Sequence, residues 1–567
     1  MKRLFLLLAA WAWLPGAQAA AECVNGQAAG FACHRVDLLG RLSVAQLGGS
    51  TGERLNDIWG WTAPNGEEYA LVGMSDGTAF VRLGADGTPE LVGRLAHSEG
   101  KASVEKVSAK SCHDDACGEA SAWRDIKVYG NYAFIVSEGE RHGVQVFDLT
   151  RLLAVSGVEH WAEADAHYGG VGHAHNIFIN EESARAYAVG NGPVRSTNDG
   201  GLHVLDISDP LAPAFLADVD GDGYTHDVQC VIYDGPDAEF LGDEICFASN
   251  EDTVTIWEVN DPANPVMLSR TGYAGAGYVH QGWLSADARY FFFNDELDEQ
   301  RTGTRTRLRV LDVSSLRAPQ LAAEYLSSAL AIDHNNYVHD RWLLQTNYAA
   351  GLRVLDVLDP LHPVEAAYFD THPMDVADFV GTWSNYRFPG SGIVVLSDIH
   401  SGLFVVRPRI EESGGADLSV ELSVAGTAIT TGERGTADVR LGAAGAADDV
   451  LLTAHLPDGA RFIAVTPPSG WQCSTPRRVV ECRAAAITAG EFEFAFEYAA
   501  DQPGDIDLIA SAYAAAADPA PADNRAVATV RASQASGNGG GGSGGGGGEA
   551  LWLAALLTLL PRRKKNH

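Results

Sequence analysis

A short strand-like phrase recurs along much of this 567-residue chain. Apolar and polar positions alternate in it, most copies end on an acidic residue, and successive copies lie roughly 50 residues apart. A period of that size with alternating strands indicates an array of repeated β units. The copies are Gly143-Val-Gln-Val-Phe-Asp148, Gly201-Leu-His-Val-Leu-Asp206, Thr253-Val-Thr-Ile-Trp-Glu258, Arg307-Leu-Arg-Val-Leu-Asp312, Gly351-Leu-Arg-Val-Leu-Asp356 and Gly402-Leu-Phe-Val-Val-Arg407.

Each unit contains four predicted strands separated by Gly, Asp, Asn and Pro turns, which is typical of a propeller blade. In one unit the predicted strands cover 175–180, 185–189, 201–207 and 213–218. Seven first strands are predicted, near Asp57, Asp125, His175, His226, His280, His334 and Trp383.

The last unit has no fourth strand before the composition changes. Residues 36–44 closely match 89–97, the fourth strand of the first unit. We therefore predict an all-β fold in which a seven-bladed β-propeller, residues 31–409, is closed by its N-terminal strand. An Ig-like β-sandwich over 416–533 is predicted to follow as a stalk, from its alternating strands at short spacing.

The two ends of the chain carry targeting signals. Residues 1–19 have a basic start, an apolar run and a small-residue cleavage site, which predicts a signal peptide and export. A glycine-rich linker, 534–549, precedes an apolar and basic tail, 550–567. The apolar run spans only about 16 Å as a helix, short of the roughly 30 Å hydrocarbon core, so a transient processing signal is favoured over a permanent anchor.

Charge and cysteine content restrict the partners and the compartment. The formal net charge of −34 repels phosphate backbones, so nucleic acid is not expected as a partner. The eight cysteines form close neighbours in sequence, and an even count in an exported chain favours disulfides, although spacing alone leaves the connectivity open. The candidate pairs are Cys23 with Cys33, Cys112 with Cys117, Cys230 with Cys246, and Cys473 with Cys482.

Four of the seven first strands begin with a histidine, and these four are consecutive: His175, His226, His280 and His334. First strands line the central channel of a propeller, so the imidazoles are expected to converge at its mouth. Imidazole is a common transition-metal ligand, and the set is a candidate site for Zn, Fe or Cu. The alternative is a purely structural histidine in each blade. Because Asp57, Asp125 and Trp383 are predicted at the equivalent positions elsewhere, a sevenfold structural need for histidine is excluded.

Acidic and aromatic residues supply weaker candidates. Asp218, Asp220 and Asp222 alternate as in a Ca²⁺ loop, but Gln229 stands where an EF-hand needs Glu. The run 294–299 is a calcium site, a salt-bridged loop or a pocket rim. Aromatic residues near the first strands either stack on a flat ligand or pack between blades. They are Trp59, Trp61, Trp123, Tyr224, Trp283, Trp383 and Tyr386.

Several stretches resemble known families. Trp123-Arg-Asp-Ile-Lys-Val-Tyr129, Glu244-Ile-Cys-Phe-Ala-Ser-Asn-Glu-Asp252 and His280-Gln-Gly-Trp283 are similar to the choice-of-anchor B family of LVIVD-repeat propellers. Asp448-Asp-Val-Leu-Leu and Trp471-Gln-Cys473 resemble Ig-like repeats of bacterial surface proteins. The tail resembles the GlyGly C-terminal sorting signal of Gram-negative bacteria. That likeness implies type II secretion, cleavage by a rhombosortase-type protease during transient inner-membrane association, and a final location at the cell surface or outside the cell.

Two functions remain open from the sequence. The first is an extracellular or cell-surface binding and interaction protein whose ligand is unspecified. The second is a metal-dependent extracellular enzyme, an oxidoreductase or hydrolase, with its site at the four histidines. Outside the glycine-rich linker the chain has no Gly-x-Ser-x-Gly elbow, and it has no phosphate-binding glycine loop or His-Glu-x-x-His helix, so serine-hydrolase and nucleotide chemistry are disfavoured.

Overall fold

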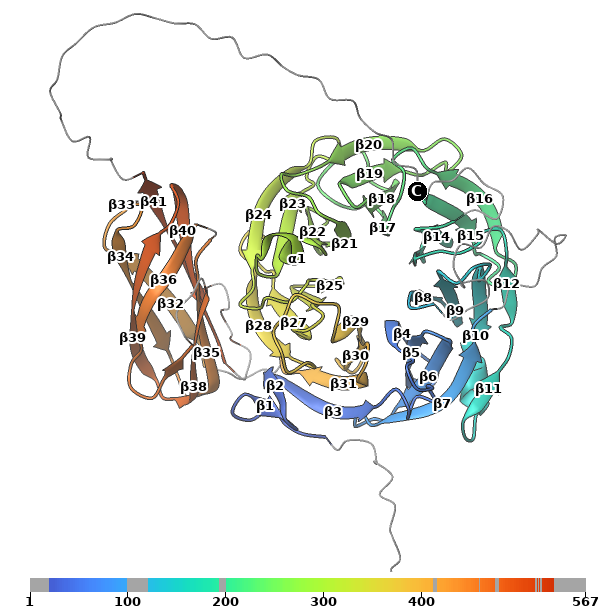
Figure 1. The fold of residues 1–567 in the computed structure, drawn as a ribbon, viewed down its shortest axis with the longest axis horizontal. Coiled ribbons are helices and arrows are strands. Elements are labelled where there is room, and N and C mark those ends of the chain that lie inside the picture. The colour runs from blue at the N-terminus through green and yellow to red at the C-terminus, as the bar shows by residue number, and fades with distance from the viewer. Residues whose placement is uncertain are drawn as a thin grey trace, which may run out of the picture.

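The computed structural model describes residues 20–98, 121–192, 200–410, 416–457, 459–474, 479–514, 518, 520 and 523–534. Residues 20–410 form antiparallel sheets arranged as a ring, and residues 416–534 form two further sheets beside it (Figure 1). Helix is confined, in these ranges, to η1 (Leu149–Ala154) and α1 (Asp298–Thr302). No helix in the described ranges has the length and apolarity needed to cross a membrane.

The ring comprises seven sheets within the described residues, each built outward from an inner strand. The first sheet contains β4 (Leu55–Thr62), β5 (Glu68–Met74), β6 (Gly77–Leu83) and β7 (Pro89–Ala96). The second contains β8 (Arg124–Tyr129), β9 (Tyr132–Ser137), β10 (Val144–Asp148) and β12 (Ala166–Tyr168). The third contains β13 (Asn176–Asn180), β14 (Arg185–Val189), β15 (Leu202–Asp206) and β16 (Ala214–Val219). The next two contain β17 (Asp227–Ile232), β18 (Glu244–Ser249), β19 (Val254–Glu258) and β20 (Val266–Thr271); and β21 (Val279–Leu284), β22 (Tyr290–Asp295), β23 (Arg307–Asp312) and β24 (Gln320–Leu326). The last two contain β25 (Asn336–His339), β26 (Trp342–Thr346), β27 (Leu352–Asp356) and β28 (Val364–Phe369); and β29 (Thr382–Arg387), β30 (Val394–Asp398) and β31 (Gly402–Pro408) with β3 (Val36–Leu42).

The N-terminal strand completes the last sheet, as the sequence match predicts. β3 pairs antiparallel with β31, with Leu42 opposite Leu403 and Val36 opposite Pro408. This pairing joins the two ends of the ring and covers the outer edge of β31, so that β3 becomes the outermost strand of the sheet.

Two outer edges carry additional strands that the four-strand repeat did not predict. β11 (Glu159–Trp161) pairs in parallel with β7 of the preceding sheet. β1 (Gln27–Ala28) and β2 (Phe31–His34) extend the sheet beyond β28. Both additions cover backbone groups that would otherwise be unpaired at the rim.

Three of the four predicted disulfides lie in the described residues, and all three form with the expected partners. Cys23–Cys33 ties the N-terminal hairpin, while Cys230–Cys246 and Cys473–Cys482 each join paired neighbouring strands. The last bond is therefore within one sheet and does not bridge two sheets as in antibody domains. Cys112 and Cys117, like the signal peptide and the C-terminal tail, lie outside the described residues.

Two sheets packed on a shared apolar core form the second unit. One sheet contains β32 (Leu418–Val424), β34 (Arg434–Ala443), β39 (Gly490–Ala500) and β36 (Ala460–Thr466). The other contains β33 (Ala428–Thr430), β41 (Arg525–Ser533), β40 (Gly504–Tyr513), β35 (Ala447–His455), β38 (Val479–Ile487) and β37 (Gln472–Cys473). Leu441, Phe496 and Leu508 are fully or almost fully buried in this core.

Polar contacts join this unit to the ring. Arg483 donates to the Tyr368 hydroxyl at 3.2 Å, and Arg525 pairs with Asp359 at 3.3 Å. His455, at the end of β35, is 9% exposed, and its ring lies 5.7 Å from that of Tyr325 on β24.

The junction histidine is expected to make the protein acid-sensitive. Burial lowers the pKa of His455 from 6.5 to about 4. Between pH 6.5 and pH 4, His455 binds a proton in the unfolded chain but stays neutral in the folded chain. The free energy of unfolding is therefore highest above pH 6.5 and falls by about 3 kcal/mol as the pH is lowered toward 4. Chemical denaturation of wild type and His455→Gln over this pH range measures the difference. Equal pH slopes for the two proteins, with exposed His160→Gln as the matched control, would contradict the assignment.

Candidate functional site

The four predicted histidines lie at the start of four consecutive inner strands. His226 and His175 directly precede β17 and β13, His334 lies two residues before β25, and His280 is the second residue of β21. Backbone bonds hold them at this level: the His175 N–H donates to the Val189 carbonyl and the His226 N–H to the Ser249 carbonyl. The repeat therefore places the same residue type at the same height in neighbouring sheets.

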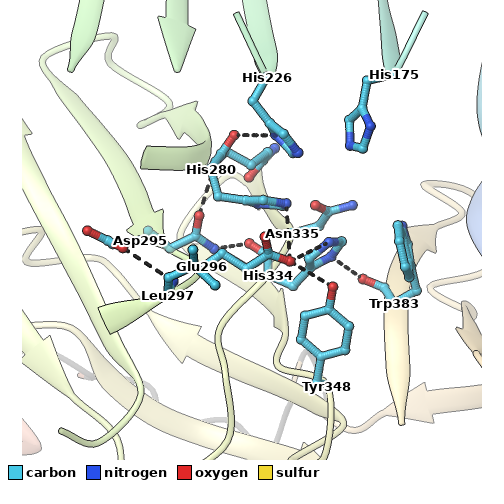
Figure 2. Close-up of polar contacts among 12 residues, drawn as sticks. His175, His226, His280, Asp295, Glu296, Leu297, His334, Asn335, Tyr348 and Trp383 are labelled. Carbon is cyan, nitrogen blue, oxygen red and sulfur yellow. Dashed lines mark hydrogen bonds and ion pairs between the residues drawn. The ribbon is translucent and has the colours of Figure 1, made fainter. Parts of the chain in front are cut away.

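The imidazole rings form a continuous arc around one side of the channel mouth (Figure 2). Ring centroids are 4.2 Å apart between His175 and His226, between His226 and His280, and between His280 and His334. The four side chains thus lie together in the structure.

Hydrogen bonds define which ring nitrogen carries the proton. The Nδ1 atoms of His226 and His334 lie 2.9 Å and 2.6 Å from the carbonyl oxygens of His280 and Trp383. A carbonyl oxygen only accepts, so both Nδ1 atoms must be the donors, and each neutral ring keeps its lone pair on Nε2. The Nδ1 of His175 contacts the Glu138 carboxylate at 2.6 Å. Such anchoring through Nδ1 is the arrangement that orients metal-binding histidines in proteins.

Glu296 brings a carboxylate to the arc. Its Oε1 atom lies 3.8 Å from Nε2 of His280 and 3.7 Å from Nε2 of His334, and it accepts a hydrogen bond from the Tyr348 hydroxyl at 2.7 Å (Figure 2). Tyr348 is 1% exposed and has a φ of +32°, which is unusual for a bulky residue. The sequence pattern places Glu296 in an acidic run with three alternative roles and does not single it out as a ligand.

Two histidines and Glu296 form the group whose geometry suits one metal ion. Among the described residues around the channel, only His280, Glu296 and His334 offer three ligand atoms within 4.8 Å of one another. With metal–ligand bonds of about 2.1 Å, the separations of 3.7 and 3.8 Å between Glu296 and the two imidazoles correspond to ligand–metal–ligand angles of about 125–130°. In the described residues, His175 and His226 extend the arc but belong to no such group.

Burial sets the charge of this group. It lowers the pKa of His226 and His280 well below the usual value and that of His334 to about 3, so these rings are neutral near pH 7. Burial also raises the pKa of Glu296 to about 7. The close approaches of Glu296 to His280 and His334 are therefore not ion pairs. The Nε2 lone pair of His334 and the Glu296 carboxyl group face one another at 3.7 Å, an arrangement that is favourable when a cation lies between them.

A layer of polar side chains closes the channel beneath the histidines. Asp57, Asp125 and Asp227 each accept a hydrogen bond from the N–H of the following residue at 2.6 Å. Asp227 follows His226 by one residue and makes the same hydrogen bond as Asp57 and Asp125. Asp57 and Asp125 are therefore equivalent to Asp227 and not to the histidines, so the predicted alignment of these positions was wrong by one residue. Arg124, at the histidine level, is fully buried and donates to the Met74 carbonyl.

Aromatic residues plug the channel one step deeper, since side chains two residues apart on a strand share a face. The Trp59 ring lies 4.9 Å from that of Tyr386, and the Trp283 ring lies 5.1 Å from that of Tyr337. Lys127 pairs with Asp125 at 2.6 Å and lies 4.5 Å from the Trp59 ring. The predicted aromatic set therefore divides in two: Trp59, Trp61, Trp283 and Tyr386 are used in packing, and Trp123, Tyr224 and Trp383 line the mouth.

The histidines open into a cavity of about 450 Å³ at the mouth. Its walls include Trp123, Tyr278, Tyr348, Phe379 and Trp383, together with Arg54. This volume falls in the range that holds small-molecule ligands. With the channel floor plugged, such a ligand enters from the mouth.

The calcium candidates are not brought together. Asp218 accepts from His203 at 2.6 Å, and Asp222 pairs with Arg270 and accepts from Asn250 at 2.8 Å. In the described residues, Asp218, Asp220 and Asp222 form no group of ligand atoms within 4.8 Å. In the run 294–299, Glu296 faces the pocket while Asp298 pairs with Arg309, so pocket rim and salt-bridged loop are both present.

A ring of repeated antiparallel sheets with a site at its central mouth defines a propeller-type repeat protein. Two segments, 120–140 and 196–220, match the LVIVD repeat, a family of β-propeller type. No curated protein matches the chain.

Two solved structures are distantly similar to this chain. The C-terminal WD40 domain of Sif2 is 9% identical with a TM-score of 0.35, and the alignment covers 66% of this chain and 91% of that one. A protein from Lactobacillus plantarum is 14% identical with a TM-score of 0.39, covering 61% and 88%. These scores carry no functional argument.

Proposed function

We propose that this protein is an exported seven-bladed propeller, carried on an Ig-like sandwich, that binds one divalent transition-metal ion at its channel mouth. His280, His334 and Glu296 are the ligands. The metal then presents an open coordination position to a small ligand in the cavity above. The protein is thus a metal-dependent binding protein of the cell surface or medium.

One observation carries this proposal: two imidazole nitrogens and a carboxylate oxygen lie within 4.8 Å of one another at the cavity wall. For His334 the proton position follows from the Nδ1 bond to the Trp383 carbonyl. The Nε2 lone pair of His334 and an ionised Glu296 carboxylate, 3.7 Å apart, repel one another without a cation between them. Two histidines and one carboxylate with open positions suit Fe(II), and imidazole with carboxylate also suits Zn²⁺.

The metal content of protein purified without a polyhistidine tag tests the proposal directly. We expect about one equivalent of Zn or Fe per chain, or uptake of one Zn²⁺ after chelator treatment, measured by elemental analysis and calorimetry. Glu296→Gln keeps the side-chain shape but removes the anionic ligand, so Zn²⁺ affinity should fall at least about tenfold. Glu491→Gln, an exposed change in the second unit, is the matched control. Wild type that neither carries nor takes up metal refutes the function.

A metal-dependent oxidoreductase or hydrolase is the second candidate. It is favoured by the position of the three ligands at the wall of a cavity, because this leaves coordination sites for a substrate or water. Turnover of a small substrate by the metal-loaded protein, absent after chelation, would distinguish catalysis from binding.

The tail supports processing on the way out of the cell. The secreted protein is expected to end within the glycine tract 537–548, because a rhombosortase-type cleavage removes the apolar segment and basic residues. Intact-mass measurement of the protein from the native host checks this. Recovery of secreted chains that still carry Asn566 and His567 would contradict it.

A further inference from the structure

We propose that the ligand of the mouth is a small flat aromatic anion, such as an aromatic carboxylate or phenolate. This inference rests on the proposed metal site and adds the chemical class of what binds there. Three properties of the cavity lead to it: flat walls, an unpaired positive charge and an adjacent metal position.

Aromatic rings surround the position next to the proposed metal. The Tyr348 ring lies edge-on to Phe379, with centroids 5.3 Å apart, and the Trp383 ring lies 5.0 Å from His334. Trp123 and Phe379 are 44% and 41% exposed and line the same cavity. Large aromatic side chains at the rim of a pocket provide flat contact surfaces that favour a planar ligand.

The cavity lining carries one cationic side chain, Arg54, and two carboxyl groups, Glu138 and Glu296, each of which already has a hydrogen-bond partner. Glu138 is bonded to His175 at 2.6 Å, and Glu296 accepts from Tyr348 and faces the metal position. Arg54 lines the cavity, is exposed, and forms no ion pair within the described part of the chain. A divalent metal adds further positive charge, so an anion is favoured over a cation here.

Size and donor chemistry agree with this class. A cavity of about 450 Å³ accommodates one aromatic ring with a short substituent. A carboxylate or phenolate oxygen supplies a donor for the open metal position, the ring stacks against the aromatic walls, and Arg54 at the rim faces the remaining anionic oxygen.

Three probes separate these contributions: benzoate, cyclohexanecarboxylate and benzylamine, each titrated by calorimetry into the Zn²⁺-loaded full chain. We expect benzoate to bind about two- to tenfold more tightly than cyclohexanecarboxylate, which has the same charge but is not flat. Benzylamine, flat but cationic, should bind at least tenfold more weakly. Chelation of the metal should weaken benzoate at least tenfold.

A charge variant tests the role of the rim. Arg54→Gln should weaken benzoate binding about two- to fivefold, as expected for a partly exposed ionic contact, and leave Zn²⁺ affinity unchanged. Arg434→Gln, the same substitution at an exposed position of the second unit, should change neither.

The outcomes distinguish the two proposals. A protein that binds no Zn²⁺ loses the proposed function itself. If the protein binds Zn²⁺ but no benzoate, or binds both carboxylates equally, the metal site stands and the proposal of an aromatic anion is wrong. Preference for benzylamine, undiminished by chelation, would instead identify an aromatic cage for cations and overturn the inference.

Discussion

Replacing both His280 and His334 with alanine is expected to abolish stoichiometric Zn²⁺ binding, with affinity at least about 100-fold weaker than wild type. The two imidazoles supply two of the three converging ligand atoms. Loss of a residue that merely orients a ligand already costs about 10–100-fold in affinity, and loss of two ligands costs more. Calorimetric titration of chelator-treated protein provides the measurement.

The comparison requires a control with the same number of imidazoles removed. His160 is exposed on β11 and His362 is partly exposed near Asp359, both away from the channel mouth. A variant with both changed to alanine should bind Zn²⁺ as wild type does. If it loses the ion while the His280 and His334 variant keeps it, the metal is bound at the surface and the mouth assignment is wrong.

Gly402→Ala is expected to destabilise the ring by about 2–5 kcal/mol. Gly402 begins β31 with a φ of +102°, where a side chain costs about 1–2 kcal/mol. A Cβ at this position would also collide with the carbonyl oxygen of Leu42 on the closing strand β3, and such overpacking typically costs about 1–3 kcal/mol. Denaturant unfolding followed by tryptophan fluorescence would report the loss.

Gly52→Ala separates the two contributions. Gly52 has a φ of +91°, but no heavy atom lies within 4 Å of the place where a Cβ would stand, so only the backbone strain of about 1–2 kcal/mol should appear. Equal effects at Gly52 and Gly402 would show that contact with the closing strand adds nothing.

The same close approach explains the glycine of the repeated phrase. At Gly351, with a φ of +68°, a Cβ would collide with the carbonyl oxygen of Phe369 on the adjacent fourth strand. The phrase was predictive because it combines two local requirements, a period-2 strand and a glycine where the next strand crosses closely. Strand order within each sheet and the pairing of β3 with β31 follow from such local patterns and could be predicted.

The candidate site was predictable only in part. Histidine at one repeated position predicts imidazoles at one level, and His175, His226, His280 and His334 do form one arc. Glu296 directly follows a second strand, β22, and its carboxylate lies beside the arc, where the Tyr348 hydroxyl donates a hydrogen bond to it. Glu138 directly follows the second strand β9 as Glu296 follows β22, and it also reaches the arc, but this pattern alone does not show which glutamate lies beside two imidazoles.

The sequence alone determined the repeat, the strands, the closing strand and the height of the histidines, because each depends on residues close in sequence or on a pattern repeated along it. It favoured the three disulfide pairs that the structure then confirmed. Tertiary structure decided which ligand atoms meet. That choice depends on side-chain directions in different sheets, and it placed His280, His334 and Glu296 together while leaving His175 and His226 beside them.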